Sequence, residues 1–174
     1  MQLKNTQEAL NKFGKYVVQQ SRSNLTKNKK NYTKKLYDSL GYEAKEMPNS
    51  ILLKFLMEEY GMYQDRGVKG VKSGTSLSNF SYKPSSNLIG LEAATGTFAK
   101  WTKFRGIQFR DKKGRFMSFK QTGILMAIGK KNKGIKPSLF FTKPFEKAFK
   151  DLPNDLIEAF ALDVDELLKY TTKK

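Results

Sequence analysis

The sequence predicts an α+β fold: a small antiparallel sheet flanked by an N-terminal helix, a central helix and two C-terminal helices. Two observations predict it. Apolar residues recur at helical spacing near both ends of the chain and in residues 119–131. The turn signal Pro48-Asn49 lies between a weakly alternating segment, 42–47, and a short apolar run, 51–57. With 174 residues, 13% of them aromatic, the chain can bury a core, so we expect a single domain over 1–174.

The first element is a helix, because four apolar residues share one face at helical spacing: Leu3, Leu10, Phe13 and Val17. We expect this helix to end within residues 21–24. A polar, basic run over 26–33 follows, as either a loop or an extension of the helix. Residues 42–47 and 51–57 then form the two strands of a hairpin.

Glycines mark the next part of the chain. We expect Gly67, Gly70 and Gly74 to lie in a loop where the backbone needs a positive φ or a close approach. Residues 72–87 are rich in Ser, Gly, Asn and Lys, which predicts a mobile segment that becomes ordered only in an assembly. A short helix starts at Phe98 and ends at Gly106.

A turn and a helix are predicted after that. The sequence Asp111-Lys-Lys-Gly114 is typical of a turn, here within a small hairpin. Residues 119–131 form a helix with an apolar stripe of Ile124, Ala127 and Ile128, and Gly134 ends it.

Two helices close the chain. Thr142 is expected to cap the first, with Pro144 in its opening turn. In the second, over 155–169, we expect three side chains to be buried: Leu156, Phe160 and Leu167. Truncating a buried Phe160 to Ala would cost about 3–5 kcal/mol. The acidic residues of this helix are expected on its solvated face, among them Asp163, Asp165 and Glu166.

Two residue types are missing from the sequence. Without Cys there are no disulfides, thiolate metal sites or cysteine nucleophiles, and without His the commonest general base and zinc ligand are lost. We therefore expect no enzyme, no cofactor and no metal; a hydrolase or nuclease using carboxylates is the remaining catalytic alternative. Residues 1–20 contain no apolar run and no segment has the length of a membrane span, so we expect neither a secretory signal nor a membrane partner.

The net charge of +17 is unevenly distributed. Residues 1–40 contain nine Lys or Arg and two acids, and residues 98–136 contain twelve Lys or Arg and one acid. Residues 137–170, by contrast, contain four Lys and seven acids. This pattern indicates a polyanion or an acidic protein surface as a neighbour, the plainer alternative being solubility.

Aromatic residues alternate with the cations of residues 103–120. Cations can neutralise phosphates while aromatic rings stack on bases, although a hairpin with one buried and one wet face shows the same pattern. The candidate contacts to DNA or to an acidic partner are Arg105, Arg110, Lys112, Lys113 and Arg115.

Four segments resemble one protein family. In order they are Thr33-x-x-Leu36-x-x-Ser39; Ile51–Met57 followed by Tyr60-x-x-Tyr63-x-Asp65-x-Gly67; Trp101-x-x-x-Arg105-Gly106-Ile107; and Ile124-x-x-Ala127-Ile128 continuing through Gly134-Ile135-Lys136-Pro137 to Phe140-Phe141 and Pro144-Phe145. Together they resemble the tail-completion and neck proteins of tailed bacteriophages, which are related to minor tail proteins of long-tailed phages. The resemblance extends from Thr33 over about four-fifths of the chain.

The resemblance implies a structural virion subunit, assembled in the host cytoplasm as a ring oligomer of the head-tail connector. Its partners would be copies of itself, portal-side adaptor and tail proteins, and packaged DNA through non-specific contact. A candidate interface loop contains Tyr63, Asp65, Arg66, Gly67 and Val68, where many relatives have an acid followed by Gly-Thr. A free basic nucleic-acid-binding protein is the alternative.

Overall fold

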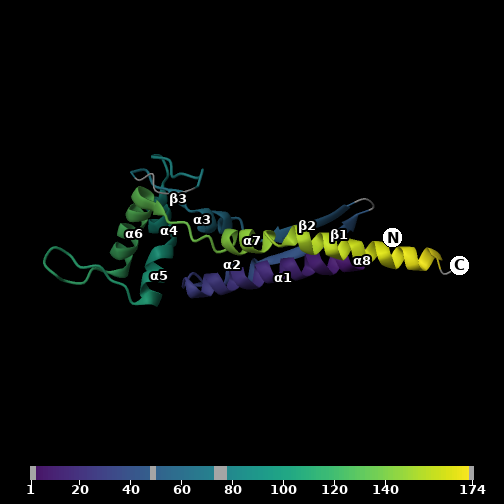
Figure 1. Ribbon diagram of the computed structural model, residues 1–174. Helices are drawn as coiled ribbons and strands as arrows, with labels where there is room; N and C mark the ends of the chain where they lie inside the picture. Colours follow the sequence, from purple (N-terminus) through teal and green to yellow (C-terminus); the bar gives the residue numbers. More distant parts are fainter. Residues whose placement is uncertain (1–2, 48–49, 73–77, 173–174) are drawn as a thin grey trace. The chain divides into compact units, whose positions relative to one another are not determined.

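The computed structural model describes residues 3–47, 50–72 and 78–172. The chain folds as two compact units: unit 1 contains residues 1–61 and 139–174, and unit 2 contains residues 62–138. In the described residues there are eight helices and two small two-stranded antiparallel sheets, which confirms the predicted α+β class (Figure 1). Two compact units can belong to one domain, so the single domain over 1–174 stays a prediction.

Unit 1 is organised around its first helix. Its elements are α1 (Lys4–Lys27), α2 (Lys35–Ser39), β1 (Gly41–Met47), β2 (Ser50–Leu56), α7 (Thr142–Phe149) and α8 (Leu152–Thr172). α1 contacts the hairpin, α7 and α8, and α8 runs alongside it (Figure 1). Because α7 and α8 come from the far end of the sequence, the core of unit 1 joins both ends of the chain.

α1 is longer than predicted. The sequence placed its end within 21–24, but the helix continues to Lys27, because Ser21 and Leu25 on its inner face are fully buried. The basic run 26–33 is therefore helical at its start, and the chain then turns at Lys29, whose φ is 52°.

The predicted hairpin is confirmed. β1 and β2 pair antiparallel from Gly41 opposite Leu56 to Met47 opposite Ser50. The ring of Phe55 packs edge-on against three other rings of the core, with centroid distances of 5.2–6.0 Å: Phe13, Phe141 and Phe145. These rings give a small core a large buried apolar area.

The predicted inner face of α8 is wrong. Its buried residues are Leu152, Ala159 and Asp163, whereas Phe160 is 50% exposed and Leu167 is also exposed; Leu156 is partly buried. The packed face of α8 thus contains the small side chain of Ala159, and Phe160 lies beside that face and not in it. The predicted cap of α7 is also wrong, since Phe141 precedes the helix and no side chain caps it.

A buried carboxylate joins α8 to α1. Oδ1 of Asp163 accepts hydrogen bonds from Asn5 N and Asn5 Nδ2, both at 2.9 Å, and Oδ2 accepts from Thr6 N at 3.0 Å and Thr6 Oγ1 at 2.7 Å. Backbone N–H groups in the first turn of a helix have no partner within the helix, and here a distant residue supplies it. The expectation that Asp163 is solvated is therefore wrong, whereas Asp165 is exposed and pairs with Lys169 at 2.6 Å.

The pKa of Asp163 reflects these contacts. Burial alone would raise it, but the hydrogen bonds from Thr6 and Asn5 outweigh burial and hold the pKa below its ordinary value. The ionised form is thus the one that the folded protein stabilises.

Unit 2 is built on three helices. Its elements are α3 (Tyr60–Arg66), whose first residues belong to unit 1, β3 (Val68–Lys69), α4 (Leu88–Thr95), α5 (Thr97–Arg105), α6 (Phe119–Lys133) and β4 (Gly134–Ile135). α6 packs against α4 and α5, and its predicted stripe contains the fully buried Ala127. The predicted ends of α5 at Gly106 and of α6 at Gly134 are confirmed.

Two of the three predicted loop glycines have the expected roles. Gly67 has a φ of 78°, and a Cβ on Gly70 would collide with the backbone carbonyl of Asn132. Gly74 lies outside the described residues. In the segment 72–87, Tyr82 donates a backbone hydrogen bond to Lys69, 2.9 Å long; residues 73–77 are outside the described part, and the mobility of the segment stays a prediction.

We expect Asp163→Ala to lower the free energy of unfolding by about 1–3 kcal/mol, because it removes a cap and leaves buried donors without acceptors. Asp165→Ala is the matched control on the same helix and should change it by less than about 0.5 kcal/mol. Urea denaturation of both variants measures the difference; equal losses would contradict the structural role of Asp163.

The same variant gives a pH dependence. Because the folded pKa of Asp163 lies below the unfolded value of about 4, its stabilisation is complete above that value and is lost as the pH falls through the folded pKa. The difference in free energy of unfolding between the native chain and Asp163→Ala should therefore be constant near neutrality and shrink in acid. A constant difference down to the acid transition would count against the capping role.

Two phenylalanines test the corrected core. Phe140 is fully buried, so Phe140→Ala should cost about 3–5 kcal/mol, whereas Phe160→Ala should cost under about 1 kcal/mol. The comparison is made by chemical denaturation. A larger loss for Phe160 would restore the original expectation that it belongs to the core.

Candidate functional site

The charge of the protein is concentrated in unit 2. Of the 33 Lys and Arg residues of the chain, 16 lie in residues 62–138, together with only three of its 16 acidic residues: Asp65, Glu92 and Asp111. Asp65 and Glu92 are both 4% exposed, and Asp111 is held in a turn by backbone hydrogen bonds. Two acidic side chains of unit 2 are thus buried and the third stabilises a turn, while many of its Lys and Arg side chains are exposed.

Glu92 of α4 is an internal cap. Its Oε2 accepts from Phe98 N at 2.7 Å and its Oε1 from Ala99 N at 2.9 Å, so the carboxylate binds the first turn of α5. Gly123 of α6 lies against this contact: a Cβ there would come within 2.6 Å of Glu92 Oε1 and 2.7 Å of Ala99 N. The three helices therefore meet at a buried charge that needs a glycine beside it.

A hairpin projects from between α5 and α6 (Figure 1). Arg110 pairs with Phe116 as an antiparallel bridge, and Met117 N donates to Phe109 O at 2.8 Å. At the turn, Gly114 has a φ of 80° and its N–H donates to Asp111 O at 3.0 Å. The predicted Asp111–Gly114 turn is confirmed, and we call residues 109–117 the basic hairpin.

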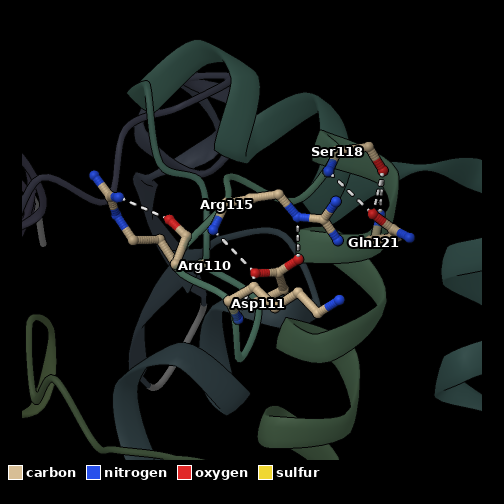
Figure 2. A network of polar contacts seen from close by, with 7 residues as sticks. Arg110, Asp111, Arg115, Ser118 and Gln121 are labelled. Carbon is tan, nitrogen blue, oxygen red and sulfur yellow. Dashed lines mark hydrogen bonds and ion pairs between the residues drawn. The ribbon is translucent and has the colours of Figure 1, made fainter.

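Asp111 organises the turn (Figure 2). Its Oδ1 accepts from Lys113 N at 2.8 Å and Arg115 N at 2.9 Å, while Oδ2 accepts from Arg115 Nε at 3.0 Å. The backbone hydrogen bond from Arg115 is the main cause that lowers the pKa of Asp111. The same figure shows Ser118 and Gln121 bonded to each other in a capping box that begins α6 directly after the hairpin.

Four of the five predicted cations gather on the basic hairpin. Arg110 places its guanidinium 4.1 Å from the centroid of the Phe116 ring and donates from Nη1 to Gly114 O at 2.8 Å. Lys112 and Lys113 are exposed at the tip. Arg105 is separate, because it lies in the last turn of α5, with its guanidinium 5.9 Å from the Trp101 ring centroid.

The aromatic residues of the hairpin face solvent. Between Phe109 and Phe116 every residue is exposed except Asp111, and Phe116 itself is 62% exposed. The alternative interpretation, a hairpin with one buried face and one solvent-exposed face, therefore does not apply to this tip. The arrangement presents cations and apolar rings together, which suits a partner that is both anionic and able to cover a ring.

The candidate interface loop is not a loop. Tyr63, Asp65 and Arg66 lie in α3, Gly67 makes the positive-φ turn after it, and Val68 begins β3. The side chains of Asp65 and Val68 are buried within the chain, and their role at an interface stays a prediction. The exposed ring of Tyr63 packs edge-on to Phe80, with 4.6 Å between centroids.

The sequence analysis did not identify three helix caps: the capping box of Ser118 and Gln121, and the carboxylates of Glu92 and Asp163. Ser118 and Gln121 had a recognisable signal, the S-x-x-Q spacing of a capping box. Glu92 and Asp163 had no such signal, because each caps a helix other than its own.

Within the described residues, no three acidic side chains converge on a metal site, and no helix is long and apolar enough to span a membrane. No protein-family model, curated protein or solved structure matches the chain. The function is therefore inferred from the residues of the chain.

The packing around Glu92 can be tested on α6. Gly123→Ala should destabilise the protein by about 1–3 kcal/mol, because the added methyl overpacks against Glu92 and the start of α5. Gly129→Ala, in the same helix but with open space around it, should stabilise it by about 0.5–1 kcal/mol. Thermal melting of both variants measures the effects, and equal shifts would refute the close contact.

Proposed function

We propose that this protein is a structural subunit of the head-to-tail connector of a tailed bacteriophage, part of a neck or tail-completion ring around the DNA path. The observation that carries this proposal is the surface of unit 2, with 16 cations against three acids that are buried or bound in a turn. Such a surface of one sign attracts a polyanion.

Assembly around DNA accounts for this charge. A ring brings together many copies of a chain with a net charge of +17, and these copies repel one another. A DNA strand on the ring axis offsets that repulsion through non-specific contacts to phosphates. The order of motifs from Thr33 to Phe145, which resembles the neck and tail-completion family, supports the same function. The other partners are then a portal-side adaptor and tail proteins, and the subunit acts by assembly and not by catalysis.

A free nucleic-acid-binding protein is the second candidate. The exposed Phe109 and Phe116 beside Arg110 and Lys112 favour it, since single-stranded nucleic acids bind to grooves where aromatic rings and cations alternate. The two candidates differ in their oligomeric state: the first requires self-association, and the second does not.

Three exposed lysines of unit 2 test the proposal. Changing Lys100, Lys103 and Lys120 to Gln should weaken duplex DNA binding and reduce the slope of log affinity against log salt by about 0.9 per lost phosphate contact. The matched control changes three exposed lysines of α1 to Gln, Lys4, Lys12 and Lys15, and should leave the slope nearly unchanged.

The same samples are weighed in solution with and without DNA. Self-association that DNA promotes, together with loss of affinity in the unit 2 variant alone, supports the connector proposal. Tight DNA binding by a chain that stays monomeric would overturn it in favour of the free nucleic-acid-binding protein. Equal loss of affinity in both variants would show that the cationic surface of unit 2 has no special role.

A further inference from the structure

α8 has a second apolar face. Five residues lie three or four positions apart along it and so share one side of the helix: Ile157, Phe160, Ala161, Val164 and Leu168. Ile157 is 68% exposed and Leu168 57%, whereas the face toward α1 is formed by Leu152, Ala159 and Asp163. We call these five residues the α8 stripe. Exposed apolar residues that adjoin one another on a helix form a candidate interaction surface.

Carboxylates border the α8 stripe on one side. Glu158 and Asp165 are exposed and lie three residues before and four residues after Ala161, so they neighbour it on the helix surface. Asp165 also pairs with Lys169 at 2.6 Å, but this ion pair is exposed and therefore weak, so the carboxylate can exchange it for a lysine of a partner. Residues 137–170 are also the part of the sequence in which acids outnumber cations, seven to four. The α8 stripe therefore suits a partner that brings apolar groups and positive charge together.

The basic hairpin has those complementary properties. Its tip exposes Lys112 and Lys113, and Phe109 and Phe116 are exposed on either side of them. One phenyl ring buried in an interface removes a large apolar area from water, and the lysines of the tip can approach the carboxylates at its border.

Duplex DNA, whose bases are stacked inside the double helix, fits the hairpin less well. Phosphates would satisfy its cations, but they would not bury Phe116, one face of which already carries the guanidinium of Arg110 at 4.1 Å. DNA would also leave the α8 stripe uncovered. Pairing α8 with α8 of a second copy would cover the stripe but would bring Glu158 and Asp165 of each copy toward those of the other, which is unfavourable.

We infer that the basic hairpin of one copy docks on the α8 stripe of the next copy, with Phe116 on the apolar residues and Lys112 and Lys113 beside Glu158 and Asp165. The contact is heterologous, because the two surfaces differ and each copy has both, and contacts of this type form a ring when the rotation between successive copies closes. This inference rests on the proposed ring function and identifies the surfaces that join its subunits.

The absence of cysteine makes a cross-linking test clean. Ala161→Cys on α8 and Lys113→Cys on the hairpin are made in separate full-length chains, one of which carries a size tag. Under mild oxidation their mixture should give the mixed disulfide dimer, and a chain with both changes should give a ladder of larger oligomers. Leu162→Cys replaces Ala161→Cys as the control, since Leu162 is exposed but not in the stripe, and should give no cross-link.

Charge reversal gives a second test with a rescue. Lys112→Glu with Lys113→Glu should weaken self-association about tenfold or more, and adding Glu158→Lys with Asp165→Lys in the same chain should restore it. Melting temperatures should change little, because all four side chains are exposed and the ion pair of Asp165 with Lys169 that is lost is exposed as well. Restored association supports the contact, because it requires the two surfaces to meet.

Three outcomes would overturn the inference. Disulfide dimers of Ala161→Cys alone would show symmetric α8 pairing, and no mixed dimer would show that the surfaces do not meet. Loss of DNA binding with intact self-association in the Lys112→Glu, Lys113→Glu variant would assign the hairpin to DNA. If the chain still forms DNA-dependent oligomers in these cases, only this contact fails; a monomeric chain overturns the proposed function as well.

Discussion

The hydrogen bonds from the start of α1 to the carboxylate of Asp163 connect the two ends of the sequence. α1 is the element on which the hairpin, α7 and α8 pack, and its first turn presents backbone donors that no residue of the helix can satisfy. Asp163 satisfies them at Asn5 and Thr6 from 158 and 157 residues away. These hydrogen bonds stabilise the ionised form of the carboxylate and outweigh the effect of its burial.

This contact also fixes the rotation of α8. With Asp163 and Ala159 turned toward α1, the larger apolar residues of the helix are directed elsewhere, and Ile157 and Phe160 remain in solvent. The exposed α8 stripe thus follows from a polar requirement in the core. It is also a surface that a partner can cover without disturbing the contact that holds α8 in place.

Unit 2 uses its carboxylates in a similar way, with a different consequence for charge. Glu92 binds the first turn of α5, and Asp111 binds the backbone of the basic hairpin. Two of the three acids of this unit thus bind its own backbone, and its cations outnumber its acids by sixteen to three. Positive charge and rings are exposed on unit 2, whereas negative charge and aliphatic groups are exposed on α8 of unit 1. Surfaces that differ in this way favour heterologous assembly of many copies over symmetric pairing.

Local signals in the sequence determined the α+β class, the hairpin of β1 and β2, the ends of α5 and α6, and the turn at Asp111–Gly114. Each of these features depends on residues close together in the chain. Examples are a glycine with positive φ, and an acid that accepts a hydrogen bond from the backbone N–H two residues later. The four cations of the basic hairpin could be named for the same reason.

Only the tertiary structure decided which face of α8 is buried and which acids are internal. Apolar periodicity shows that a helix has an apolar side, but α8 has two such sides, and a contact with Asn5 and Thr6 selects between them. The position of Glu92 beside Gly123 is likewise a contact between helices that are apart in sequence. Hydrogen bonds between residues far apart in the sequence produce no periodic pattern in it, because tertiary packing and not sequence spacing decides their partners.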